Sequence, residues 1–173
     1  MFREMAGELC RLRPYRRGDA SALCAVANDF EVVRWTTRRF PHPYALRGAE
    51  EWIAIAMAAP RGQILAIEVA GAIAGGIAVE PHEGERAGTA LFGYWLGRLY
   101  WGRGIATEAA RLLSDFALQS GDFRRLEATV FAPNLASAKV LTKCGFALEG
   151  RSPGFYVDRS DAVCDGLLFG RTR

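Results

Sequence analysis

The chain has 173 residues, of which 50% are hydrophobic and 24% charged, and its formal net charge is +3. This composition is too apolar for a disordered protein, and no apolar run reaches the roughly 18 residues that a membrane helix requires. The arginines are spread along the sequence, which argues against a nucleic-acid-binding protein. The length fits a single domain over residues 1–173.

Cysteine and histidine are sparse and scattered. The four cysteines are far apart with no CxxC pair, and the two histidines have no ligand-like neighbours. We therefore expect no metal and reduced thiols. The first residues contain no apolar core of signal-peptide length, which favours a cytoplasmic location.

The first third of the chain carries the signals of one short strand and three helices. Apolar and polar residues alternate from Glu8 to Arg13, which predicts a strand. Asp19 suits the N-cap of the helix that follows, and the prolines at 41 and 43 require a loop. Helices are expected over residues 19–27, 29–36 and 50–58, the last ended by Pro60.

Three strands are expected next, over residues 63–69, 73–79 and 87–96. Ala70 and Gly71 form the signal for a hairpin between the first two, and a polar turn from Pro81 to Gly84 precedes the third. These runs predict an antiparallel meander.

The second half alternates helix and strand. Apolar residues recur at helical spacing from Ile105 to Phe116, and Gly121 ends that helix. The remaining elements are expected at 126–131 (strand), 134–144 (helix), 147–149 (strand) and 164–169 (strand). The unit from Leu91 to Phe131 implies a parallel crossover. The fold class is α/β, a mixed and mostly antiparallel sheet of about six to seven strands with helices on both faces.

The stretch from Tyr94 to Ala109 carries the clearest chemical signal. A strand ends, a loop turns through Gly102 and Gly104, and an amphipathic helix begins. The unpaired amides and partial positive charge of such a helix N-terminus bind anions, phosphate above all. The loop is neither a P-loop nor a dinucleotide fingerprint. Taken alone, it is equally a tight turn.

A second stretch strengthens this interpretation. It runs from Phe131 through Asn134 and Ser137 to Gly145 and Phe146. Together the two stretches resemble the GNAT superfamily of acetyl-CoA-dependent N-acetyltransferases, in its ribosomal-protein-alanine (RimJ/RimL-like) branch. The first is similar to the pattern YWGxGxATEA of that branch, and the second to NxxSxxxLxxxGF. The opening LRPYRRGD and the Pro43-Tyr44 pair are also similar to branch features.

The resemblance implies the GNAT (acyl-CoA N-acyltransferase) fold, acetyl-CoA as cosubstrate without a metal, and direct attack of an amine on the thioester. Ser137 would protonate the leaving thiolate, because Leu141 stands where many members have a tyrosine for that step. Glu127 is the carboxylate expected nearest the cleft and is the candidate base. The implied cofactor-binding residues are Trp95, Leu96, Trp101, Gly102, Arg103, Gly104, Ile105, Ala106, Thr107 and Asn134.

The acceptor is less well specified. The expected activity is acetylation of a primary amine, such as the N-terminal α-amine of a protein or peptide. The alternatives are a small-molecule amine (an antibiotic, a polyamine or an amino-acid analogue) and a non-catalytic acyl-CoA-binding module. The acceptor cleft is expected between Arg34–Tyr44 and Phe155–Asp161. Neither nucleic acid nor membrane is an expected partner, and a monomer and a homodimer stay equally open.

Overall fold

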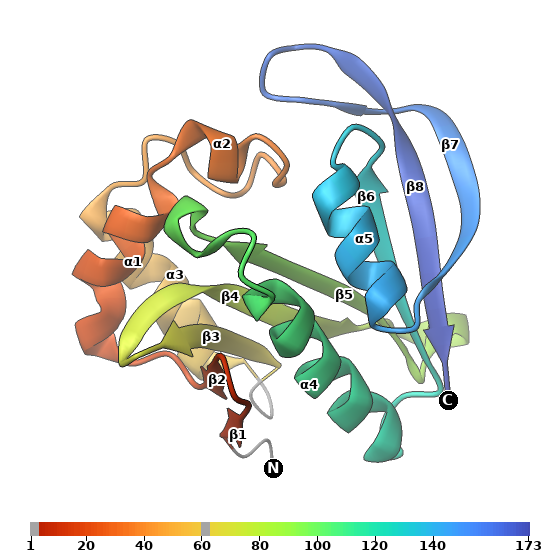
Figure 1. The fold of residues 1–173 in the computed structure, drawn as a ribbon, viewed down its shortest axis with the longest axis horizontal. Coiled ribbons are helices and arrows are strands. Elements are labelled where there is room, and N and C mark those ends of the chain that lie inside the picture. Colours follow the sequence, from red (N-terminus) through yellow and green to blue (C-terminus); the bar gives the residue numbers. More distant parts are fainter. Residues whose placement is uncertain (1–3, 60–62) are drawn as a thin grey trace.

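The structure, a computed structural model, describes residues 4–59 and 63–173 and is built around one eight-stranded sheet (Figure 1). The strand order is β1-β2-β3-β4-β5-β6-β8-β7. The strands are β1 (Met5–Ala6), β2 (Arg11–Arg13), β3 (Ile64–Val69), β4 (Ala72–Pro81), β5 (Thr89–Leu96), β6 (Arg125–Phe131), β7 (Ala147–Val157) and β8 (Val163–Thr172). The helices are α1 (Ala20–Ala27), α2 (Phe30–Val33), α3 (Leu46–Ala58), α4 (Ile105–Gln119) and α5 (Leu135–Lys143).

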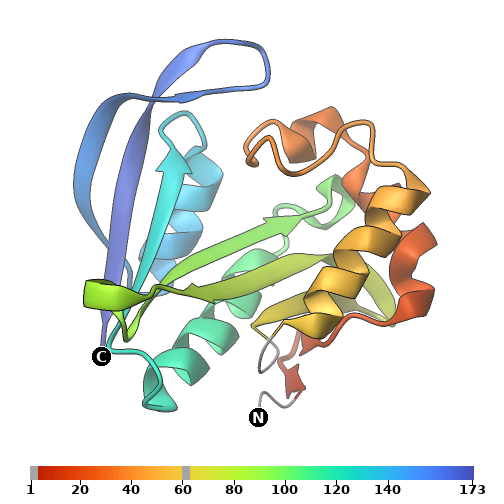
Figure 2. The same ribbon diagram turned by 180° about the vertical axis from the view of Figure 1, so that it is seen from behind.

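The sheet consists of two antiparallel halves joined by one parallel seam. Strands β1 to β5 are antiparallel neighbours, and so are β6, β8 and β7. At the seam, Thr89–Leu91 of β5 pair with Arg125–Glu127 of β6, and beyond these residues the two strands run apart (Figure 2). The predicted parallel crossover and the mixed α/β class are therefore confirmed, with one strand more than expected.

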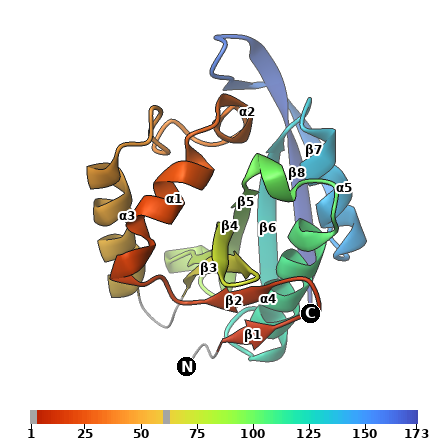
Figure 3. The same ribbon diagram turned by 60° about the vertical axis from the view of Figure 1, so that its left-hand side comes forward.

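Helices cover both faces of the sheet, as predicted. Figure 3 shows α1 and α3 on one side and α4 and α5 on the other. Leu23 and Ile53 pack with Ile73 on the first face. Ile105 and Leu113 belong to the larger core on the second face. Each helix thus buries an apolar stripe against the sheet, which is the main source of its stability.

Several element boundaries differ from those that the sequence predicts. Helix α3 begins at Leu46, earlier than residue 50, and the expected stop at Pro60 lies outside the described residues. Helix α2 is only a single turn. Strand β7 continues to Val157, well beyond the expected end at residue 149. Strand β8 begins at Val163, one residue early, and continues to Thr172 instead of ending at residue 169. The hairpin at Ala70-Gly71 is confirmed.

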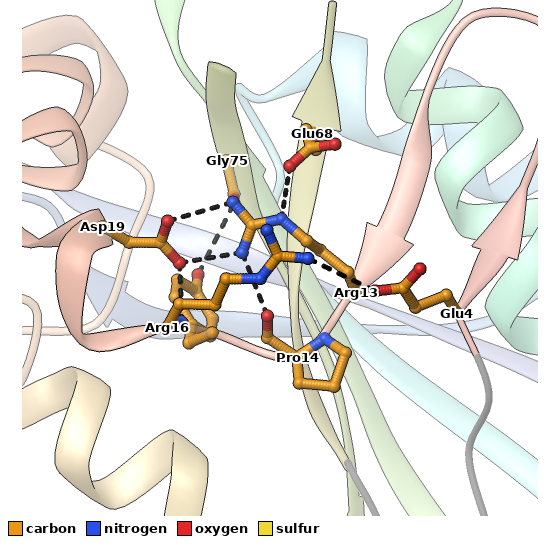
Figure 4. A network of polar contacts seen from close by, with 8 residues as sticks. Glu4, Arg13, Pro14, Arg16, Asp19, Glu68 and Gly75 are labelled. Carbon is orange, nitrogen blue, oxygen red and sulfur yellow. Dashed lines mark hydrogen bonds and ion pairs between the residues drawn. The ribbon is translucent and has the colours of Figure 1, made fainter. Parts of the chain in front are cut away.

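Asp19 holds the predicted N-cap position of α1, but its carboxylate makes no capping hydrogen bond to that helix. It accepts hydrogen bonds from both terminal nitrogens of Arg13, at 2.8 and 3.0 Å, and from the Arg16 amide at 2.7 Å. Arg13 also contacts Glu68 of β3 and is only 3% exposed (Figure 4). The cluster therefore joins β2, β3 and the start of α1. Burial alone would raise the pKa of Asp19, but the bonds from Arg13 and Arg16 outweigh it and hold this pKa below its usual value.

We expect Asp19→Asn to lower the free energy of unfolding by about 3 kcal/mol at neutral pH, because the buried Arg13 guanidinium loses one of its negatively charged partners. Because the folded pKa of Asp19 is depressed, its contribution is complete above the unfolded pKa of 3.8 and is lost as the pH falls through the folded pKa. The difference in the free energy of unfolding between the native protein and Asp19→Asn should therefore become smaller on strong acidification. Urea unfolding at several pH values measures it.

Arg47→Ala is the matched control, since it breaks the exposed ion pair of Arg47 with Glu51. Such a fully exposed pair contributes little to stability. An Asp19→Asn cost no larger than that of the control would contradict the role given to the buried cluster.

Candidate functional site

A cavity of about 420 Å³ lies among α2, the end of β5, the loop that follows β5, and α5. A smaller cavity of about 90 Å³ adjoins it in the wedge between β5 and β6. Ten of the residues predicted from the sequence line the larger cavity: Trp95, Leu96, Trp101, Gly102, Gly104, Ile105, Ala106, Thr107, Asn134 and Ser137. Arg103 and Glu127 do not line it.

The loop before α4 presents the helix N-terminus to this cavity. Gly102 and Gly104 have φ angles of 72° and 80°, in the left-handed region that side chains disfavour. The Glu108 amide donates to the Gly104 carbonyl at 3.0 Å, and the amides of Ile105–Thr107, in the first turn, have no intrahelical acceptor. The cavity wall therefore carries free donors and the positive end of the helix dipole, which suit a phosphate group.

Glu108 supports this helix end from outside the cavity. Its carboxylate accepts hydrogen bonds from the amides of Glu8, Leu9 and Cys10, at 2.9, 2.8 and 2.9 Å. Burial would raise the pKa of Glu108, but these bonds outweigh it and lower the pKa. The carboxylate therefore stays ionised and fixes the first turn of α4 against the segment before β2.

The last residues of β5 have a free backbone edge toward β6. The Gly97 amide donates to the Ala74 carbonyl of the neighbouring β4 at 2.7 Å. Because a strand alternates with period two, the backbone groups of Leu96 and Tyr94 point the other way, toward β6. The β5–β6 ladder has already stopped at Leu91, and the Leu96 carbonyl is taken by the Trp101 indole at 2.7 Å. The Leu96 amide remains as a donor facing the wedge.

Asn134, Ser137 and Tyr94 form a hydrogen-bonded group on the wall shared by the two cavities. Asn134 caps α5 by accepting the Ser137 amide on its side-chain oxygen at 3.2 Å. The Tyr94 hydroxyl lies 2.9 Å from the Ser137 hydroxyl and 3.1 Å from the Ser137 carbonyl. Burial is the largest influence on Tyr94 and raises the pKa of its phenol, so it remains protonated at neutral pH.

The sequence does not single out Tyr94 as a functional residue. Alternation along β5 does place Tyr94 on the same side as Phe92 and Leu96. The hydroxyl partner, however, comes from α5, 43 residues later in the chain. No local pattern signals that pairing.

The structure places Glu127 at the paired end of β6, opposite Leu91, and away from Ser137. Its carboxylate accepts hydrogen bonds from Arg125, at 3.0 Å, and from Arg86. Burial would raise the pKa of Glu127, but the two arginines outweigh it and lower the pKa. A carboxylate that is paired twice and lies outside the cavity is poorly placed to accept a proton from a ligand there.

The two stretches expected to shape the acceptor cleft touch each other. Arg38 donates to Asp161 at 3.0 Å and to the Asp158 carbonyl at 3.2 Å. Arg159 donates in return to the Thr37 carbonyl at 2.8 Å. The turn between β7 and β8 is therefore fastened to the segment after α2. That segment and α2 line the cavity through four residues. Trp35 and Thr36 belong to the stretch expected to shape the cleft, whereas Glu31 and Val32 lie before it.

Comparison with known proteins identifies the family. Residues 10–147 match the family model described as an acetyltransferase (GNAT) domain. A probable N-acetyltransferase, YjcK of Bacillus subtilis (strain 168), is 47% identical over 62 residues, which are 36% of this chain and 34% of that protein. The alignment thus spans about a third of the curated relative.

Solved structures agree over a much larger part of the chain. The structure of RimL, described as a ribosomal L7/L12 alpha-N-protein acetyltransferase in complex with coenzyme A, has a TM-score of 0.85 at 20% identity and covers 98% of both chains. Mycobacterium smegmatis RimJ, in complex with CoA-disulfide, has a TM-score of 0.81 at 28% identity and covers 94% of this chain and 81% of that one. Within residues 4–59 and 63–173, no helix is both long and apolar enough to span a membrane.

The cap at Asn134 gives a prediction. We expect Asn134→Ala to reduce the free energy of unfolding by about 1 kcal/mol, because it removes the acceptor for the Ser137 amide. Asn134→Asp keeps that acceptor and should restore the loss. Chemical denaturation of both variants tests this, and equal stability of Asn134→Ala and the native protein would contradict it.

Proposed function

The chain belongs to the GNAT family of acetyltransferases, and from that premise we propose that it transfers an acetyl group from acetyl-CoA to a primary amine, specifically the N-terminal α-amine of a protein or peptide. One observation carries the proposal. A single cavity combines the free N-terminus of α4, the unpaired edge of β5 and the Ser137 hydroxyl. Each matches one part of a thioester cosubstrate: phosphate, amide-bearing arm and leaving sulfur.

The cosubstrate is held by backbone more than by charged side chains. Its pyrophosphate lies on the amides between Gly102 and Thr107, at the positive end of α4. Its pantetheine arm lies along β5 in the wedge, where Asn134 also faces the cavity. The Leu96 amide donates to the thioester carbonyl and stabilises the negative charge that develops on that oxygen. Arg103, which does not line the cavity, acts at most as a charge near its rim.

Ser137 is the proton donor to the leaving thiolate, and Tyr94 orients it. The Tyr94 hydroxyl has one proton and two acceptors within reach, the Ser137 carbonyl and the Ser137 hydroxyl oxygen. When Tyr94 donates to the hydroxyl oxygen, the proton of Ser137 is free to point into the cavity. The pair thus gives the sulfur a proton while Tyr94 stabilises the oxygen that lost it.

The acid–base cost favours an α-amine as acceptor. An α-amine has a pKa of about 7.7–8.0, and a lysine amine about 10.4. Removing a proton at pH 7.4 therefore costs under about 1 kcal/mol for the former and about 4 kcal/mol for the latter. One structural neighbour, RimL, is itself described as an alpha-N-protein acetyltransferase.

A small-molecule amine is the second candidate, because the cavity volume of about 420 Å³ lies within the usual range of small-ligand sites. A polyamine suits it least, since Arg34, Arg38 and Arg159 gather around the segment that covers the acceptor side. Incubation with acetyl-CoA and a panel of peptide amines, polyamines and amino-acid amides, followed by release of the CoA thiol, separates these classes. Acetyl-CoA binding without turnover of any amine would leave only a binding module.

Gly102→Glu should abolish acetyl-CoA binding, because it puts a side chain and a negative charge where the pyrophosphate lies. Isothermal calorimetry measures this. We expect micromolar affinity for the native protein, which corresponds to about 8 kcal/mol, and no detectable heat of binding for the variant.

Gly84→Glu is the matched control. Gly84 also has a positive φ, of 60°, and open space at its Cβ position, but it lies in the turn before β5 and does not line the cavity. The control should bind acetyl-CoA normally. Equal affinities of the two variants would refute the placement of the pyrophosphate at Gly102. No binding by the folded native protein would refute acetyl-CoA as the cosubstrate.

Ser137→Ala should lower kcat by about 100-fold with little change in acetyl-CoA affinity, the pattern of a lost acid catalyst. Tyr94→Phe keeps the serine and should lower kcat by a smaller factor, about tenfold. Release of the CoA thiol with the best peptide amine of the panel measures both.

Tyr100→Phe, another aromatic residue of the cavity, serves as control and should leave kcat within about twofold of the native value. A Ser137→Ala variant with native kcat would exclude Ser137 as the acid. A Tyr94→Phe variant with native kcat would exclude only the orienting role.

A further inference from the structure

Charge is distributed unevenly around the larger cavity. Its lysines, Lys139 and Lys143, both belong to α5, next to the positive N-terminus of α4. The acidic residue among its described lining is Glu31, which comes from α2. The cavity therefore has a positive wall made by α4 and α5 and a negative point on the α2 side.

The fold fixes Glu31 in this place. Asp29 caps the short helix α2 by accepting the Glu31 amide at 2.9 Å. Val32 and Val33 are 5% and 0% exposed and anchor the same turn in the interior. Trp35 follows Glu31 by four residues and lines the cavity with it, so the two side chains lie on one side of the segment.

Among the residues that the structure describes, Glu31 has no ionic partner, in contrast to carboxylates such as those of Asp161 and Glu127. Asp161 pairs with Arg38, and Glu127 pairs with Arg86 and Arg125. In the part of the chain that the structure describes, no arginine, lysine or histidine lies within ion-pairing distance of Glu31. A partly buried carboxylate without a cation favours a cationic ligand. The Trp95 ring on the same cavity adds an aromatic surface for an ammonium, whereas the Arg34 guanidinium already covers a face of the Trp35 ring, 4.6 Å from its centroid.

We infer that Glu31 binds the ammonium group of the acceptor and takes its proton. The binding of the ammonium stands without the proposed acetyl transfer, and only the acceptance of its proton rests on that function. The Glu31 carboxylate accepts one proton from R–NH3⁺ and leaves R–NH2, whose lone pair attacks the thioester carbon. The C–S bond then breaks with its electrons on sulfur, which gains a proton, and the nitrogen loses its second proton. In the net reaction, the ammonium and acetyl-CoA give the amide and the CoA thiol, and one proton is released to solvent.

The binding half is tested with glycinamide, a small primary ammonium, titrated into the protein without cosubstrate at constant ionic strength. Trp35, Trp95 and Trp101 line the cavity, so their fluorescence reports its occupation. We expect saturable quenching for the native protein and at least about tenfold weaker binding for Glu31→Gln, since a hydrogen-bonded charge is lost. Acetamide, which lacks the ammonium, should not distinguish the two proteins.

Glu83→Gln is the matched control, because it removes the same charge from an exposed turn that does not line the cavity. It should bind glycinamide as the native protein does. If Glu31→Gln and the native protein respond alike to glycinamide, including no saturable response from either, the inference is overturned.

A kinetic measurement separates this inference from the proposed function. With a peptide amine, Glu31→Gln should lower kcat/KM for the amine by about tenfold or more and leave the KM for acetyl-CoA unchanged. A Glu31-dependent glycinamide site in a protein that acetylates no amine would keep the ammonium site and refute the acetyl transfer. Normal turnover by Glu31→Gln would support the acetyl transfer and refute the ammonium site at Glu31.

Discussion

The short seam between β5 and β6 determines where the sheet opens into the two cavities. Three residues of each strand pair, and then the strands separate. They can separate because each is secured on its outer side, β5 by a long antiparallel ladder with β4 and β6 by one with β8. The inner edges of both strands keep unpaired backbone groups that need partners. Both cavities touch β5 beyond the seam, so the open part of the sheet and the binding site are the same feature.

Local patterns predicted the elements on which the seam depends. The helix from Ile105, the strand from residue 126 and the hairpin at Ala70-Gly71 all rest on periodicity or turn chemistry within a few residues. Strand β7 shows why the remaining elements were less predictable. It is mostly exposed, and Gly150, Pro153 and Gly154 read as turn residues in the sequence. It is a strand because it pairs with β8 along most of its length, and that long-range pairing overrides weak local preference.

In the candidate site, too, features set by a local stretch of sequence were predictable and features set by long-range contacts were not. The anion-binding end of α4 was predictable, because the glycines, the helix start and the unpaired amides all lie within one stretch of chain. Contacts between distant segments were not. The sequence placed Glu127 near the cleft because it lies on the right strand, but only the register shows that it sits at the closed end. Glu31, conversely, belongs to a helix of one turn whose single sequence signal is the capping Asp29. What distinguishes it is its place on the cavity together with the lack of an ion pair to any residue that the structure describes.

The hydroxyl pair of Tyr94 and Ser137, which we propose acts on the leaving thiolate, lies beside the part of β5 that has separated from β6. Leu141 occupies the position at which the family resemblance expects a tyrosine, and here it is fully buried in the core with Phe92 and Phe146. A phenol is still present, but it comes from β5 and reaches across to α5. Tyr94 lies beyond Leu91, on the part of β5 that no longer pairs with β6, and its hydroxyl meets Ser137 there. The room that the diverging strands leave and the phenol beside the serine therefore occur at the same place in the sheet. The position of a hydroxyl in space matters here more than its position in the sequence.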